Sequence, residues 1–208
     1  MKIVVLIILV VAIAVAWFAT RSRAQVSTSS KAAARKQSDA KQVYLGLRKT
    51  MLDGPRTKFS LPPTSKPTEP WGVLMDWGVN NGTATVVAAS DGSASVYFSG
   101  GGGYIGGKGQ EPIRLAAQKA VEVARAVQLP SQPTTDFPLP ETGGVFFYFL
   151  TDAGVFTFRT SVQELNSPSH PLRTLGDAIQ GVITQYRMWD EGGRKGAGGT
   201  LVGPNQSK

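Results

Sequence analysis

The stretch with most potential for chemistry is the glycine-rich segment 100–110, GGGGYIGGKGQ. It is expected between a strand and a helix that starts at Pro112, where free backbone N–H groups and the helix dipole can hold an anion. Its residues match most of a phosphate-binding P-loop, but Gly109 stands where that motif needs Ser or Thr to bind magnesium. We predict that the segment contacts a ligand or a partner through Gly102, Gly103, Tyr104, Ile105, Gly106, Gly107 and Lys108.

Two other interpretations of this segment stay open. The first is a flexible crossover in which glycines supply positive φ values and no ligand binds. The second is a nucleotide-binding or anion-binding protein, or an enzyme, that uses the same segment. Tyr104 and Ile105 are its two apolar residues, and they either fold back onto the core or project as a contact.

No other residues form a recognisable catalytic or metal-binding set. His170 is the one histidine, it precedes Pro171, and it is expected to cap a helix or to lie in a solvated loop. A metal site needs three or four ligands, and with 0 cysteines only carboxylates remain. Asp76, Asp91 and Asp152 are typical of strands and turns, so we expect no metal, no cofactor and no catalytic residue.

The elements that would position these residues follow from hydrophobic periodicity. Alternating patterns and turn signals such as Asp91-Gly92 predict five strands, over 71–79, 83–90, 93–99, 145–150 and 155–160. Helical spacing of apolar residues predicts two helices, over 113–128 and 171–189. The predicted class is α+β, a five-stranded antiparallel sheet in the order β-β-β-α-β-β-α with both helices on one face. Profilin-like, longin-like and roadblock-like folds share this layout, which does not determine function.

Three stretches also support a resemblance: LMDWG at 74–78, DGSASVYFSGGGG at 91–103, and Gly106-Gly107. They resemble a group of uncharacterised bacterial proteins, over about residues 71–189. The resemblance implies that these residues belong to one domain, and it implies no activity.

The ends of the chain differ in composition from this domain. Residues 3–19 are apolar throughout, so we predict a transmembrane anchor at 1–19, with a cleaved signal peptide as the alternative. A basic and proline-rich flexible tether, in which residues 43–52 can form a short helical turn, is expected at 20–69. The α+β domain is expected at 70–190, and a disordered glycine-rich tail at 191–208. The excess of Lys and Arg after the apolar segment predicts a cell-membrane protein with its domain in the cytoplasm. A periplasmic or extracellular domain is the alternative.

The net positive charge is confined to the tether. The formal net charge is +8, and ten basic and two acidic residues lie within 20–58, so the rest of the chain is neutral. A neutral domain does not favour nucleic acid as a partner. The predicted partners are the lipid bilayer and an unidentified protein. Anionic lipid would contact the tether at Arg21, Arg23, Lys31, Arg35 and Lys36.

The sequence therefore predicts a membrane-tethered binding or scaffolding module without catalysis. The alternatives are a nucleotide-binding or anion-binding protein or enzyme that uses the segment 100–110, and an exported envelope protein.

Overall fold

A computed structural model describes residues 34–80, 82–127, 132–192 and 200–201. The chain divides into two compact units, Met1–Asp39 and Ala40–Lys208. Residues 34–39 are the described part of the first unit, and they are helical. The second unit holds the rest of the fold.

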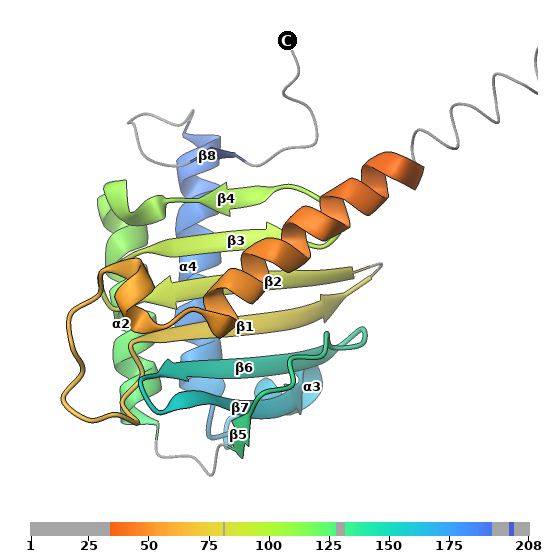
Figure 1. The fold of residues 1–208 in the computed structure, drawn as a ribbon. Coiled ribbons are helices and arrows are strands. Elements are labelled where there is room, and N and C mark those ends of the chain that lie inside the picture. Colours follow the sequence, from red (N-terminus) through yellow and green to blue (C-terminus); the bar gives the residue numbers. More distant parts are fainter. Residues whose placement is uncertain (1–33, 81, 128–131, 193–199, 202–208) are drawn as a thin grey trace, which may run out of the picture. The chain divides into compact units, whose positions relative to one another are not determined.

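The second unit is built on one antiparallel sheet (Figure 1). In the described residues it has seven strands and a two-residue strand at one edge, in the order β5-β7-β6-β1-β2-β3-β4-β8. Their bounds are β1 Gly72–Val79, β2 Gly82–Ala89, β3 Ala94–Phe98, β4 Gly103–Ile105, β5 Gln132–Thr134, β6 Gly144–Thr151, β7 Gly154–Ser161 and β8 Thr200–Leu201. β1 lies in the middle, because it pairs with β2 on one side and with β6 on the other.

Helices cover both faces of the sheet, as Figure 1 shows. On one face lie α2 (Glu111–Ala126) and α4 (Arg173–Glu191). The helix that ends at residue 53 crosses the opposite face. Three short helices complete the described fold: η1 Arg56–Phe59, η2 Gly107–Gly109 and α3 Val162–Leu165.

The alternation of β1 explains why there are two hydrophobic cores. Val73 and Met75 belong to the core under α2 and α4, whereas Leu74 points to the other face. There it joins Tyr44 and Leu52 from the helix that ends at residue 53. Both faces of β1 are thus buried, as expected of a central strand with cover on each side.

The predicted fold class is wrong in three respects. Five strands were predicted, but β4 and β5 are further strands and β8 lies at the edge beside β4. Two helices on one face were predicted, but a third long helix covers the other face, and α3 is present as well. The predicted strands correspond to β1, β2, β3, β6 and β7, and the predicted helices to α2 and α4.

The ends of the predicted domain also differ from the structure. Residues 34–53 are helical where a flexible tether was expected up to residue 69. Tyr44, Leu52 and Leu61 are core residues that lie outside the predicted domain at 70–190. In the predicted disordered tail at 191–208, α4 ends at Glu191 and Thr200–Leu201 form β8. The other residues after 192 lie outside the described part.

The single-pass membrane location is corrected by the structure. None of the helices in the described residues is long and apolar enough to cross a membrane. The predicted anchor at 1–19 lies outside those residues. We therefore do not propose a membrane location.

Candidate functional site

A hollow lies at one end of the sheet, beside the last turn of α2. It has a volume of about 520 Å³, which lies within the range of small-molecule sites. Its walls come from the loop 65–70, from α2, and from the hairpin of β6 and β7. We call it the α2 groove; its lining is Ser65, Lys66, Thr68, Glu69, Pro70, Ala124, Arg125, Val127, Phe149, Thr151 and Phe156.

The floor of the α2 groove is apolar. Phe149 of β6 and Phe156 of β7 are directly opposite each other in the strand register. Phe149 is buried and Phe156 is half-buried, and Val127 adds an aliphatic wall after the end of α2. The half-buried ring of Phe156 is the part of this pair that a planar ligand can reach, and the ring of Phe149 packs beside it in the sheet.

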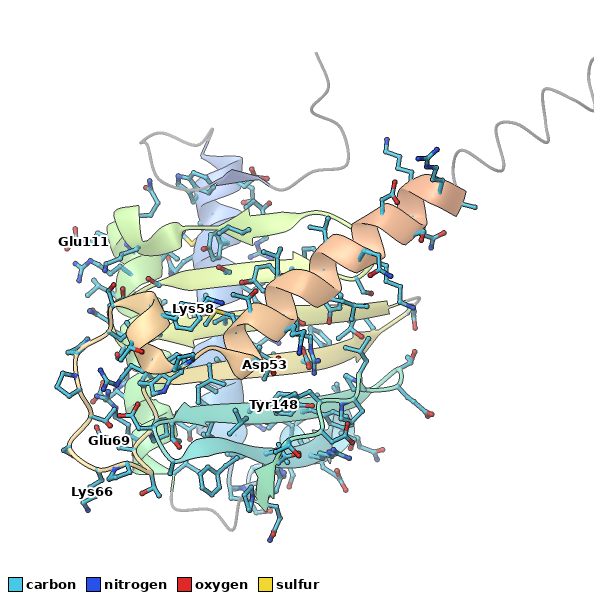
Figure 2. All side chains as sticks on the ribbon, in the orientation of Figure 1. Asp53, Lys58, Lys66, Glu69, Glu111 and Tyr148 are labelled. Atoms are coloured by element: carbon cyan, nitrogen blue, oxygen red, sulfur yellow. The ribbon has the colours of Figure 1, made fainter. Side chains whose placement is uncertain are left out.

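The rim of the groove carries charge. Arg125 of α2 lies 3.0 Å from Glu69, Nε to Oε1, and its Nε donates a hydrogen bond of 2.9 Å to the carbonyl of Pro70. Figure 2 shows Lys66 and Glu69 on the loop along this edge of the molecule. The Arg125 contacts therefore tie the loop to α2.

Glu69 is held in its ionised form by the loop itself. Its Oε2 accepts a hydrogen bond of 2.9 Å from the backbone N–H of Ser65, and another from the Ser65 hydroxyl. The hydroxyl contact is the main reason that the pKa of Glu69 is lowered, with Arg125 contributing further. At neutral pH the rim therefore contains one carboxylate and two cations, Lys66 and Arg125.

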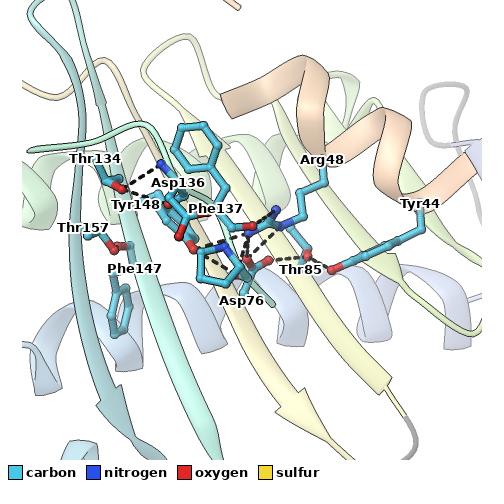
Figure 3. Close-up of polar contacts among 11 residues, drawn as sticks. Tyr44, Arg48, Asp76, Thr85, Thr134, Asp136, Phe137, Phe147, Tyr148 and Thr157 are labelled. Atoms are coloured by element: carbon cyan, nitrogen blue, oxygen red, sulfur yellow. Dashed lines mark hydrogen bonds and ion pairs between the residues drawn. The ribbon is translucent and has the colours of Figure 1, made fainter. Parts of the chain in front are cut away.

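A second charged cluster lies buried between the sheet and the helix that ends at residue 53 (Figure 3). The guanidinium of Arg48 donates twice to Oδ2 of Asp76, over 2.8 Å from Nε and 2.5 Å from Nη2. The hydroxyl of Thr85 donates to Oδ1 of Asp76 over 2.5 Å, and lies 2.8 Å from the hydroxyl of Tyr44. We call Tyr44, Arg48, Asp76, Thr85 and Tyr148 the Arg48 network.

The rest of the Arg48 guanidinium is also satisfied. Nη1 donates to the carbonyl of Phe137 over 2.9 Å, and Nη2 donates to that of Pro138 over 3.2 Å. The ring of Tyr148 lies 5.4 Å from the guanidinium carbon, and its hydroxyl also donates to Pro138. Arg48 and Asp76 are 5% and 0% exposed, and the guanidinium donors of Arg48 are used within the protein. Their function is to fix the helix and the 137–138 loop on the sheet.

Electrostatics agree with a structural function for the Arg48 network. Burial raises the pKa of Asp76, and the hydrogen bonds from Arg48 and Thr85 oppose that shift. Burial alone would lower the pKa of Arg48, but the bond to Asp76 holds it above its usual value. The two charges thus depend on each other.

The structure incorporates the predicted contact segment 100–110 into the fold. Gly103, Tyr104 and Ile105 form β4, and Gly107 and Lys108 belong to η2. The ring of Tyr104 stacks on Tyr186 of α4 at 5.2 Å between centroids, and its hydroxyl donates to Asp190. A contact of this segment with a ligand or partner stays a prediction.

Several glycines of this segment have the conformation that the sequence suggested. Gly102 and Gly106 have φ of 86° and 81°, values that other residues rarely adopt. Lys108 is paired with Asp91 at 2.6 Å, so its charge is engaged within the protein. Although burial raises it, the pKa of Asp91 is held below its usual value by hydrogen bonds from Lys108 and Ser93.

The remaining residues considered for chemistry occupy structural positions. Asp152 pairs with Arg56 at 2.9 Å. His170 lies 3.2 Å from the hydroxyl of Thr160 through Nε2, and its Nδ1 accepts the backbone N–H of Leu172 over 3.1 Å. Within the described residues, no three histidine or carboxylate side chains are grouped to hold a metal ion.

Of the predicted lipid-binding residues, Arg21, Arg23 and Lys31 lie outside the described part of the chain. Arg35 and Lys36 lie on the helical residues 34–39, where both are exposed. Contact with anionic lipid stays a prediction.

Sequence reasoning missed the α2 groove. Its residues come from four separate segments, and none of them forms a motif. The one available signal was the unusual apolar run at 145–150, which includes Phe149. That Phe149 lies beside the end of α2 follows only from the topology of the sheet. The Arg48 network was missed because Arg48 and Asp76 are 28 residues apart in the sequence and belong to different elements.

Comparison of the chain with protein-family models, curated proteins and solved structures gave no match. The resemblance to uncharacterised bacterial proteins stays an expectation.

Proposed function

We propose that the second unit is a binding module without catalysis, and that its ligand lies in the α2 groove. The observation that carries the proposal is the composition of this groove. An aromatic floor of Phe149 and Phe156 lies beneath a charged rim of Lys66, Glu69 and Arg125. Concave sites with an apolar lining and a few polar groups are typical of ligand binding.

The buried charges support binding over catalysis. Catalytic acids and bases need a substrate within hydrogen-bond reach. The Arg48–Asp76 pair is enclosed, and His170 is engaged on both ring nitrogens. The exposed polar groups of the α2 groove can orient a ligand, and we assign them that function.

A neutral aromatic probe tests this proposal. Naphthamide is titrated into the full-length chain while backbone amide shifts are followed by NMR. We expect saturable shifts at Val127, Thr151 and Phe156, because these residues line the groove.

Two substitutions of phenylalanine provide the comparison. Phe156→Ser removes half of the aromatic floor and should weaken naphthamide binding about tenfold or more. Phe98→Ser removes a 40% exposed ring that is not part of the groove, and should leave binding unchanged. Equal effects of the two variants, or the absence of saturation, would refute the proposal.

A further inference from the structure

The excess of positive charge on the rim is the feature that indicates a ligand class. Lys66 and Arg125 carry two positive charges, and Glu69 carries one negative charge. The side chain of Arg125 is 38% exposed, so it remains accessible from solvent. An anionic group in the α2 groove would neutralise the remaining charge.

The hydrogen-bonding capacity of Glu69 is already used inside the protein. Ser65 donates to it through the backbone N–H and through the hydroxyl, and Arg125 lies beside it. Glu69 is therefore a part of the loop that positions Arg125. A cationic ligand would find this carboxylate engaged, and would meet two like charges.

Arg125 and Lys66, in contrast, have hydrogen-bond donors that are not used within the described residues. Arg125 uses Nε on Pro70 and Glu69, and its Nη groups make no hydrogen bond to the described residues. The ammonium of Lys66 likewise has no hydrogen bond or ion pair within the described part of the chain. Guanidinium Nη groups match the two oxygens of a carboxylate.

We propose that the α2 groove binds a small organic carboxylate with a planar apolar body. The carboxylate meets Arg125 and Lys66, and the body lies on Phe149 and Phe156. A volume of about 520 Å³ accommodates one molecule of this kind. This inference rests on the proposed function of the groove and adds the chemistry of its ligand.

The test compares naphthoate with naphthamide, which share the apolar body and differ in charge. Both are titrated into the full-length chain under the same conditions. We expect naphthoate to bind about tenfold more tightly, because a charge-assisted hydrogen bond contributes about that factor. The preference should shrink with added salt, since the rim is partly exposed.

Three variants assign the preference to particular side chains. Arg125→Gln should abolish the preference, so that this variant binds naphthoate no more tightly than naphthamide. Arg114→Gln, which removes an arginine of α2 outside the groove, should change neither ligand. Glu69→Gln should strengthen naphthoate binding about twofold to fivefold, because it removes the one carboxylate of the rim.

The outcomes separate the two claims. Equal affinities for naphthoate and naphthamide would overturn the carboxylate inference and leave the proposed function in place. A preference that survives Arg125→Gln would also overturn the inference. If neither compound binds, both the inference and the proposed function fail.

Discussion

At the scale of single residues, the most consequential contact is the ion pair between Arg48 and Asp76. Both side chains are enclosed, and every donor and acceptor around them is used by Thr85, Tyr148 or the 137–138 carbonyls. A buried pair adds little net stability over an apolar pair, but the loss of one partner leaves an isolated charge. The pair therefore specifies where the helix docks.

We predict that Arg48→Met lowers the free energy of unfolding by about 3–5 kcal/mol, because Asp76 would then be buried without its cation. Lys49→Met is the control. Lys49 forms an exposed pair with Asp53 on the same helix, and its loss should cost less than about 0.5 kcal/mol. Urea unfolding of both variants provides the measurement, and similar costs would show that the Arg48 network does not fix the helix.

The tyrosines of the network provide a pH test. Burial, aided by the charge of Asp76, raises the pKa of Tyr44 to about 12. Burial also raises the pKa of Tyr148 to about 12. Because an unfolded phenol titrates near pH 10, this stabilisation is complete below about pH 10 and is lost as the pH rises towards 12.

We expect most of the phenolate absorbance to rise in an upper step above about pH 10, which contains Tyr44 and Tyr148 together with Tyr97 and Tyr186, whose pKa values burial also raises. Unfolding by urea should become easier between about pH 10 and 12. In Tyr44→Phe the upper step should lose one phenol. A single step near pH 10 in a protein that is still folded would contradict the assigned burial.

At the scale of elements, β4 shows why some of the fold could not be predicted. A strand of three residues between glycines is too short to show alternation, although Tyr104 and Ile105 are residues that strands favour. It forms because Gly103 has φ of 149° and approaches the backbone of β3 closely. By contrast, β1, β2 and β3 follow directly from alternation and turn signals, which is why those predictions agree with the structure.

The helix that ends at residue 53 was predicted only as a short helical turn at 43–52, and the reason is different. Its buried residues, Tyr44, Arg48 and Leu52, recur every four positions, as expected of one helical face. Arg48, the middle residue of the three, is charged. It therefore interrupts the apolar stripe by which an amphipathic helix is recognised in a sequence. Arg48 can point into the core because it forms an ion pair with the buried Asp76 of β1, which is distant in the sequence.

We predict opposite outcomes for two glycines of the segment 100–110. Gly103→Ala would place a Cβ 2.1 Å from the carbonyl oxygen of Val96, and should cost more than about 2 kcal/mol. Gly100→Ala meets nothing within 4 Å, and should change stability by less than about 0.5 kcal/mol. Thermal unfolding of the two variants tests this, and a tolerated Gly103→Ala would mean that β4 does not pair closely with β3.

At the scale of the whole molecule, the folded unit is larger than the sequence suggested. The second core combines Trp71, Leu74 and Val87 of the domain with Tyr44 and Leu52 of the preceding helix. Removal of that helix would expose one face of the sheet and would leave Asp76 without Arg48. The helix is therefore an integral layer of the fold.

We accordingly expect a chain that starts at Ala40 to fold cooperatively, and one that starts at Pro70 to be unfolded or aggregated. The reason is that a bare apolar sheet face and an unpaired buried carboxylate are both costly. Near-ultraviolet circular dichroism and thermal melting would compare the two. Equal melting temperatures of the two chains would show that residues 40–69 do not contribute to the hydrophobic core.

The central claim is that the α2 groove is the ligand-binding site of this protein, and hydrogen exchange of the full-length chain tests it most directly. Exchange is measured by mass spectrometry with and without saturating naphthoate. We expect slower exchange in the loop 65–70, the last turn of α2 and the hairpin of β6 and β7, with no change at 100–110. Protection confined to 100–110, or no protection anywhere, would contradict it.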